Sequence, residues 1–240
     1  MLGQRLAEAA LGAPYPVVAG ATILWFASIY AAIAGGAYWL AVERLPAAVA
    51  SAGGRAQRLR PGQLREELLL SALSILVFAA QAVALVWMLR RGWLEVDWQR
   101  SLWHLAWELP LLYLWNELHF LAVHRLLHWP PLYRSVHVWH HRSVLTTPFS
   151  AYSFHPLESF LLGLVLPLAL VAHPFSPWAL LGLTVMSLAL NVGGHLPHES
   201  LRPAFGFALP HARYHNRHHR EFRLHYGFSL SLLDKWLGTR

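Results

Sequence analysis

The chain has 240 residues, which suggests one domain or at most two. Hydrophobic residues make up 56% of it and charged residues only 13%, values that exclude a disordered chain and argue against a soluble globular one. The formal net charge is +7, but in so apolar a chain basic residues indicate membrane orientation rather than nucleic-acid binding, and we expect no nucleic-acid partner. Cysteine is absent, which excludes disulfides, thiolate zinc sites and iron–sulfur clusters.

Two apolar stretches in the N-terminal part are each long enough to cross a bilayer, which takes about 20 mostly apolar residues. Residues 17–41 contain no charge, and residues 68–89 end at Arg90 and Arg91. An arginine-rich loop joins them. We expect residues 1–103 to form an N-terminal transmembrane anchor of two spans and this loop.

Residues 102–123 predict a third span, which differs from the first two in its ionisable side chains. Glu108, Glu117 and His119 all fall within it. Because such groups are costly at membrane depth and usually face a protein interior or a wet cavity, we expect this helix to lie against other helices. His104 and Glu108 are one turn apart and are placed to pair with each other.

Two shorter apolar runs, residues 157–172 and 178–191, are separated by a turn that contains Pro174 and Pro177. At about 1.5 Å per residue these runs barely cross the hydrocarbon core, so we expect a helical hairpin that crosses with help from its flanks or is partly re-entrant. The expected fold is all-α, an integral-membrane helical bundle of about three full spans plus this hairpin.

Alternation of these spans assigns the loops to two sides of the membrane. Residues 42–66, 124–156 and 192–240 fall on one side and carry 15 of the 19 basic residues. Cytoplasmic loops carry an excess of Lys and Arg, so this side is predicted to be cytoplasmic. The clustered histidines fall on the same side, and we therefore expect a multi-pass membrane protein with its histidines on the cytoplasmic face.

All 16 histidines lie between His104 and His225, and ten of them form four groups with spacings of three or four residues. Such spacings place side chains on one face of a helix. Ten imidazoles exceed the four ligands of a structural zinc site and suit two metal ions with about five each. Near-six coordination with open positions favours iron. The groups are His124 and His128; His137, His140 and His141; His195 and His198; and His215, His218 and His219.

These groups and the residues around them resemble the fatty acid hydroxylase/sterol desaturase superfamily of integral-membrane di-iron enzymes. The resemblance runs from about Leu111 to Thr239 and includes His-Arg-x-x-His at 124–128, His-x-x-His-His at 137–141 and 215–219, and Asp-Lys-x-x-Gly-Thr at 234–239. It implies that residues 104–240 are the catalytic domain, with the remaining spans and a cytosolic helical cap that holds a histidine-rich dimetal site. It also implies that the ten grouped histidines are the metal ligands.

Six further residues are candidates to orient these ligands through hydrogen bonds. Glu117 lies close to two turns before His124 and is expected to orient His124 or His128. The other candidates are His155, Glu158, Glu199, His211 and His225.

The implied activity is O2-dependent hydroxylation, or desaturation, of an unactivated C–H bond. The substrate would be a lipid, fatty-acyl or sterol/isoprenoid-like molecule taken from the bilayer, and the cofactor two Fe ions, which zinc can replace in purified protein. Since the chain has no cysteine for an iron–sulfur centre, electrons would come from an external donor, a reductase with a ferredoxin or cytochrome. The alternative is a histidine-rich zinc-binding membrane protein, a hydrolase or a transporter, without oxygenase activity.

Overall fold

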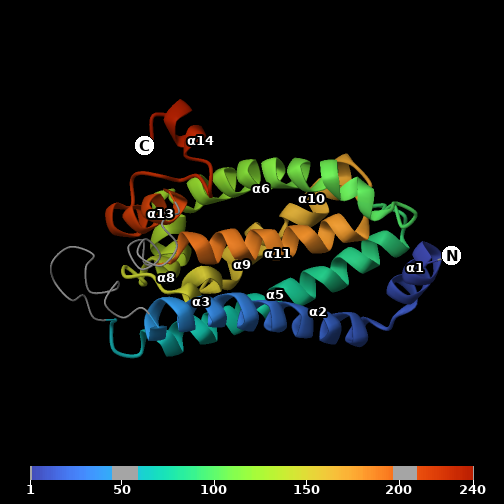
Figure 1. Ribbon diagram of the computed structural model, residues 1–240, viewed down its shortest axis with the longest axis horizontal. Coiled ribbons are helices and arrows are strands. Elements are labelled where there is room, and N and C mark those ends of the chain that lie inside the picture. The colour runs from blue at the N-terminus through green and yellow to red at the C-terminus, as the bar shows by residue number, and fades with distance from the viewer. Residues whose placement is uncertain (1, 45–58, 197–209, 240) are drawn as a thin grey trace.

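The computed structural model describes residues 2–44, 59–196 and 210–239, and every regular element in these ranges is helical. Long helices run side by side, with the N-terminus at one end of the bundle and the C-terminus at the other (Figure 1). The long elements are α2 (Tyr15–Tyr30), α5 (Gln63–Arg90), α6 (Leu105–Leu127) and α11 (Pro177–Gly194). Helices α9 (Pro156–Gly163) and α10 (Val165–Ala172) form the first arm of the hairpin that α11 completes. An additional helix, α1 (Leu2–Gly12), precedes the first span.

Three helices are long and apolar enough to cross a membrane: Tyr15–Ala41, Gln63–Arg90 and Pro177–Gly194. The first runs on from α2 through η1 (Ala31–Gly35) and α3 (Gly36–Tyr38) into η2 (Trp39–Arg44), and η1 and η2 are wider, π-helical turns. The two N-terminal spans are therefore confirmed, and the protein is a multi-pass membrane protein. The third candidate span among the described residues is α11, which was expected as a hairpin arm at residues 178–191 and is longer at both ends. The shorter apolar helix Pro156–Ala172 pairs with it. Helix α6, which contains most of the expected third span of residues 102–123, is not among the three.

Helix α6 contains most of the expected third span. It is long but has two chemically different faces. Leu111, Leu114 and Leu118 are about half exposed and form an outward apolar stripe at helical spacing. Asn116 and Glu117 are buried on the inward side. The inward polar residues reduce the average hydropathy of α6, whereas the outward stripe is suited to contact with lipid.

The far end of the bundle is held by Glu108, which is fully buried where the hairpin turns. Its carboxylate accepts hydrogen bonds from Arg100 Nη1 at 2.5 Å and from the backbone N and hydroxyl of Ser176 at 3.1 and 2.5 Å. The predicted pair with His104 is not formed, because the His104 ring turns back to the Ser101 carbonyl oxygen, 3.2 Å from Nδ1.

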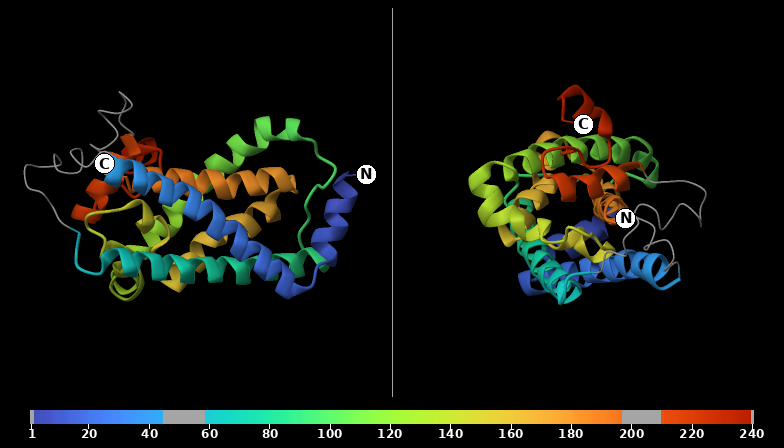
Figure 2. Two further views of the ribbon diagram at one scale, coloured as in Figure 1. Left: turned by 60° about the horizontal axis from the view of Figure 1, so that its bottom comes forward. Right: turned by 90° about the vertical axis from the view of Figure 1, so that its left-hand side faces the viewer.

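Alternation of the helices brings every motif-bearing segment to the opposite end. The last turns of α6 and α11 meet η4 (Tyr133–His137), α8 (Val138–His141) and α13 (Pro210–Glu221) there, and α14 (Ser231–Trp236) lies above them (Figures 1 and 2). The chain between α8 and α9 passes through the short helix η5 (Pro148–Tyr152).

One apolar core joins the predicted anchor to the predicted catalytic domain. Tyr30 of α2 and Ile75 of α5 pack in the same cluster as Tyr152 of η5 and Leu188 of α11. The Tyr30 and Tyr152 rings are stacked, with centroids 5.6 Å apart. The N-terminal spans thus support the segment that follows the second histidine group.

Candidate metal centre

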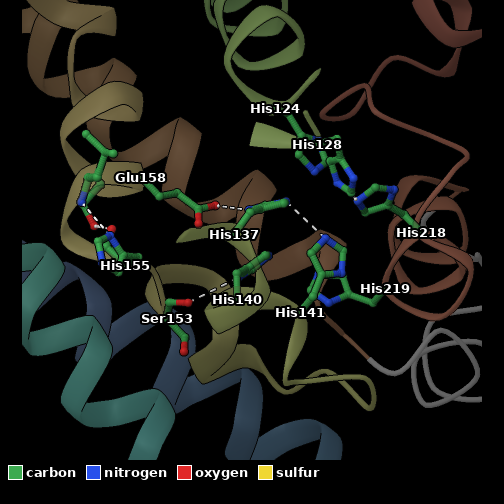
Figure 3. Close-up of polar contacts among 12 residues, drawn as sticks. His124, His128, His137, His140, His141, Ser153, His155, Glu158, His218 and His219 are labelled. Atoms are coloured by element: carbon green, nitrogen blue, oxygen red, sulfur yellow. Dashed lines mark hydrogen bonds and ion pairs between the residues drawn. The ribbon is translucent and has the colours of Figure 1, made fainter. Parts of the chain in front are cut away.

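Nine of the ten grouped histidines converge into two sets, each with its ligand-capable atoms within 4.8 Å of one another. The sets come from the ends of α6 and α11, from the η4–α8 segment and from α13. Figure 3 shows the members contributed by α6, by the η4–α8 segment and, in part, by α13. All nine side chains are buried except that of His128, which is half-buried. The first set is His124, His128, His137, His141 and His218, and the second is His140, His195, His215 and His219.

The two His-x-x-His-His motifs contribute to the sets in a reciprocal way. In the η4–α8 motif, the first and last histidines, His137 and His141, enter the first set, and the middle histidine enters the second. In the α13 motif, His215 and His219 enter the second set, and His218 enters the first. Each motif therefore offers an i, i+4 pair to one site and its i+3 side chain to the other, which ties the two sites into one centre.

Distances between ring nitrogens within the sets match those of ligands that share one ion. Two nitrogens bound at about 2.1 Å lie about 3.0 Å apart at a right angle and about 3.4 Å apart at the tetrahedral angle. The Nε2–Nε2 distance is 3.1 Å for His137 and His141 and also for His215 and His219. It is 3.0 Å for His195 and His215 and 3.4 Å for His140 and His195.

Hydrogen bonds that Nδ1–H donates determine which ring nitrogen keeps a lone pair for a metal ion. Nδ1–H of His140 donates to the Ser153 carbonyl oxygen at 3.3 Å, and Nδ1–H of His195 donates to the Asn191 carbonyl oxygen at 2.7 Å. A neutral ring that donates through Nδ1 carries a lone pair on Nε2. Both Nε2 atoms therefore present lone pairs to each other across 3.4 Å, an arrangement that a cation between them would stabilise.

Protonation of the rings is a poor source of such a cation, because burial disfavours the charged imidazole. Burial lowers the pKa of His195 to about 4, and burial together with the neighbouring histidines lowers the pKa of His140 well below its usual value. The same causes depress the pKa values of His137, His141, His215, His218 and His219. Neutral imidazoles at ordinary pH are the form that binds a metal, so the residues present fit two metal ions.

Comparison with known proteins agrees with this geometry. The profile of the fatty acid hydroxylase family matches residues 109–239, more than half of the chain. The chain belongs to the fatty acid hydroxylase family. It is 31% identical over 114 residues to the Delta(7)-sterol 5(6)-desaturase of Saccharomyces cerevisiae, a match that covers 46% of this chain and 30% of that protein.

Another relative of this fatty acid hydroxylase family member has a comparable sequence identity. Lathosterol oxidase of Rattus norvegicus is 28% identical over 108 residues, covering 45% of this chain and 36% of that protein. The matches thus span only about a third of the length of these curated relatives. No solved structure matches the chain significantly.

One carboxylate of the family member lies directly against the histidine sets. Glu158 Oε1 is 2.8 Å from His137 Nδ1, and both side chains are buried (Figure 3). A carboxylate at Nδ1 holds the ring so that Nε2 faces the set. Glu158 was a candidate for this position on sequence grounds.

Glu117 acts on a different partner from the one expected. Its two oxygens accept hydrogen bonds from the backbone N of Ser229 at 3.1 Å and of Leu230 at 3.0 Å, and its contact with His124 or His128 is not formed. The reason is that the C-terminal loop folds back over α6 and presents unpaired N–H groups to this carboxylate. Glu117 thereby fixes the loop whose Tyr226 carbonyl oxygen accepts from His124 Nδ1 at 2.8 Å.

Asp234 closes the same loop. Its carboxylate accepts from the backbone N of Tyr226 and of Gly227, each at 2.8 Å. A Cβ added at Gly227 would lie 2.7 Å from Asp234 Oδ2, so the close approach requires glycine there. The Asp-Lys-x-x-Gly-Thr motif is thus a structural clamp on the carbonyl that orients His124.

A further buried carboxylate, Glu67 of α5, was not predicted. It accepts from Ser143 Oγ at 2.7 Å, from Thr147 Oγ1 at 2.6 Å and from Gln63 Nε2 at 2.8 Å. These bonds tie the segment after α8 to the N-terminal spans. The only sequence signal was a glutamate just before the apolar run of residues 68–89.

The remaining predicted residues lie around the centre. His155 caps α9 by accepting from Leu157 N at 3.1 Å and packs against Trp139, apart from both sets (Figure 3). His211 at the start of α13 donates to the Leu190 carbonyl of α11, and the His225 ring packs on Tyr214. His198 and Glu199 lie outside the described residues.

Beneath the histidine sets, the helices form a mostly apolar, partly open cavity of about 130 Å³. Its lining includes Phe154 and Phe120, whose ring centroids lie 5.0 Å from those of His140 and His124 respectively. Residues of α2, α5, α6, α9, α10 and α11 complete the wall. An apolar ligand in this cavity would therefore lie next to the histidines.

Proposed function

We propose that the protein is an O2-dependent di-iron oxygenase that hydroxylates, or desaturates, an unactivated C–H bond of a lipid. The observation that carries this proposal is the pair of buried, neutral histidine sets directly above an apolar cavity. The nine clustered histidines are proposed as ligands, and His198 as a tenth. Residues 104–240 are proposed as the catalytic domain and residues 1–103 as its membrane anchor.

Two bound iron ions would supply the reduction of O2 and the oxidising power for C–H cleavage. Hydroxylation consumes one O2, two electrons and two protons, and releases one water molecule with the alcohol. Desaturation with the same reactants yields an alkene and two water molecules. The names of the relatives, a sterol desaturase and a lathosterol oxidase, support a lipid substrate without choosing between the two outcomes.

The chain's own residues prepare the site for this chemistry. Nδ1 hydrogen bonds of His124, His140 and His195 hold the rings with Nε2 inward, and burial keeps them neutral. The phenyl rings of Phe120 and Phe154 keep water from the space between histidines and substrate. Preorganised ligands and an apolar cavity keep the oxidant close to the substrate C–H bond and away from bulk water.

Electrons must reach the buried sets from outside, and α13 joins an exposed outer face to three of the buried histidines. Arg213, Arg217 and Arg220 are exposed on the side of α13 opposite its three buried histidines. We assign this face to the docking of an acidic ferredoxin or cytochrome by electrostatic attraction. The loops that the sequence assigns to this side carry 15 of the 19 basic residues, which supports a cytoplasmic location for it.

Docking is tested by the rate at which reduced ferredoxin reduces the iron-loaded enzyme at several ionic strengths. Arg213→Gln/Arg217→Gln/Arg220→Gln is expected to slow reduction about tenfold at low salt and to flatten its salt dependence. The matched control is Arg5→Gln/Arg91→Gln, two exposed arginines at the opposite end. An unchanged rate in the triple variant would refute the docking face.

The proposed activity is tested by lipid profiling of a deletion strain complemented with wild type or with His140→Ala. Wild type, and not the variant, is expected to restore one lipid species that carries an added hydroxyl group or double bond. Purified iron-loaded wild type should also consume O2 only when reductant is present. Tight zinc binding without O2 uptake after iron-replete expression would favour the zinc-protein alternative.

A further inference from the structure

Helix α14 presents an exposed apolar face. Leu232 and Trp236 lie one helical turn apart, and Leu237 follows directly after the helix. Trp236 is 73% exposed, and the two leucines are about half exposed. Single exposed apolar side chains are common on proteins, but a group of them on one face indicates a binding surface. The outer face of α13, by contrast, carries arginines such as Arg217 and is suited to water.

The polar groups of α14 point the other way and are bonded within the protein. Asp234 is buried, and its carboxylate accepts from the backbone N of Tyr226, the backbone N of Gly227 and Thr239 Oγ1, each at 2.8 Å. An element that enters lipid needs its polar groups satisfied internally, because hydrocarbon offers them no partner. Among the described residues of α14, the exposed charged side chain is Lys235, whose long stem lets its ammonium reach the headgroups.

Contacts with α6 fix the level at which α14 begins. Glu117 accepts from Leu230 N at 3.0 Å, and Tyr113 Oη is 2.7 Å from Ser229 Oγ. Glu117 precedes His124 by seven residues, which is about 10 Å along the helix axis at 1.5 Å per residue. Leu230, the residue before α14, therefore lies about two helical turns nearer the middle of the bundle than the end of α6 that carries the histidines.

At this level the surface of α6 is apolar. Leu114 and Leu118, which flank Glu117 in the sequence, are about half exposed and belong to the outward stripe of α6. Helix α14 lies outside the bundle on the side of α6, opposite α2 and α5 (Figures 1 and 2). In a bundle of membrane-spanning helices, an element displaced sideways at this level is surrounded by lipid. The apolar face of α14 therefore extends the lipid-facing surface of α6.

We propose that α14 is an interfacial helix inserted among the lipids of the leaflet on the histidine side. Its three exposed apolar side chains lie at the boundary of headgroups and acyl chains, and Lys235 lies at the headgroups. The insertion also bears on the metal centre. Asp234 of α14 holds Tyr226, whose carbonyl oxygen accepts from His124 Nδ1, so lipid contact stabilises the loop that orients this histidine.

The absence of cysteine makes the test direct, because one nitroxide label can be attached at one chosen residue of the full chain. Leu237→Cys is labelled and reconstituted in phospholipid vesicles. Electron paramagnetic resonance then measures collisions of the label with O2, which concentrates in hydrocarbon, and with water-soluble chromium(III) oxalate. Leu118→Cys on α6 is the lipid reference, and Arg217→Cys on α13 is the water reference.

We expect the Leu237→Cys label to collide more often with O2 than with chromium oxalate, as the lipid reference does, and the water reference to show the reverse order. Adding Leu232→Gln/Trp236→Gln to the labelled chain should reverse the order at residue 237, because the apolar face that holds the helix in lipid is lost. Lys235→Gln is the matched control: it changes an exposed side chain of the same helix and should leave the order unchanged.

Collisions at residue 237 that match the water reference would overturn the inference. A label shielded from both reagents, with its spectrum broadened by a second nitroxide, would also overturn it, because α14 would then pack against a second copy of the chain. An unchanged order in Leu232→Gln/Trp236→Gln would contradict the assigned face. No turnover is needed, so the result is independent of the proposed oxygenase activity.

Discussion

Among single residues, the orientation of the imidazole lone pairs accounts for the pairing of rings in the histidine sets, which the number of histidines alone does not. Each His-x-x-His-His motif divides its side chains between the two sets. His140 and His195 meet through Nε2 atoms while their Nδ1 atoms are bound to backbone carbonyls. Each set therefore depends on residues from several segments, and removal of one side chain should weaken one site more than the other.

The first prediction concerns His140. His140→Ala removes one of the four described histidines of the second set and should lower bound metal from about two ions per chain to about one, since the first set is intact. Elemental analysis of iron-reconstituted protein measures this directly. His104→Ala is the control, because His104 bonds locally at Ser101. Full metal content in His140→Ala would remove His140 from the ligand set.

The second prediction concerns the carboxylate behind His137. Glu158→Gln keeps the size of the side chain but removes its charge from Nδ1. Loss of such a partner typically costs about 10- to 100-fold in metal affinity or activity, so iron affinity should fall within this range while the helical circular dichroism is retained. Competition with a chelator of known affinity measures it. Wild-type affinity in the variant would mean that the contact does not tune the site.

The ligand types were predictable from sequence, but their distribution was not. Spacings of three and four residues correctly indicate a shared helix face at His137–His141 and at His215–His219. They do not reveal that His140 leaves its neighbours for the second set, because this depends on where α13 and α11 cross the short α8 helix. Backbone acceptors such as the Ser153 and Asn191 carbonyls carry no side-chain signal at all.

At the scale of helices, buried carboxylates fasten the elements that carry the centre. Glu67 holds the segment after α8, Glu117 holds the C-terminal loop, and Glu108 holds the hairpin turn at the other end. The long helices could be located from the lengths of the apolar runs, but the partners of two glutamates could not. The predicted partners of Glu108 and Glu117 were wrong, because both carboxylates bond to groups more than one helical turn away in sequence.

The third prediction concerns the Arg100–Glu108 ion pair at the hairpin turn. Glu108→Ala removes the buried carboxylate that accepts from Arg100 and Ser176, while Asp97 stays paired with Arg100 at 3.0 Å, so the loss should be below the cost of breaking a fully buried pair, about 3–5 kcal/mol. Thermal unfolding in detergent micelles should show a clearly lower midpoint. Glu95→Ala, an exposed glutamate in the same loop region, should leave the midpoint near wild type. Equal midpoints for the two variants would show that the Arg100–Glu108 pair does not hold the hairpin.

In the molecule as a whole, helices that alternate in direction gather the nine described grouped histidines at one end. The alternating direction of the helices follows from the order and length of the apolar segments, so it could be predicted from the sequence. The family match covers the chain from α6 onward, and the N-terminal spans pack against that part through Tyr30 and Ile75. No local sequence pattern indicates this packing between distant segments, so it could be found only from the structure.

The fourth prediction concerns membrane orientation, and the lack of cysteine makes it simple to test. Ser135→Cys places one exposed thiol at the histidine end, and Gln99→Cys places one at the other. If the histidine end is cytoplasmic, a membrane-impermeant maleimide should label only Gln99→Cys in intact spheroplasts and both variants after lysis. Labelling of Ser135→Cys in intact spheroplasts would reverse the orientation.

The central claim is that this fold builds two metal sites from two interlocked histidine sets. Its most direct test is an anaerobic titration of the metal-free full chain with Fe(II), with bound iron counted at equilibrium. We expect saturation at about two ions per chain in wild type and about one fewer in His140→Ala. Saturation at a single ion in wild type, or no specific uptake of iron, would contradict it.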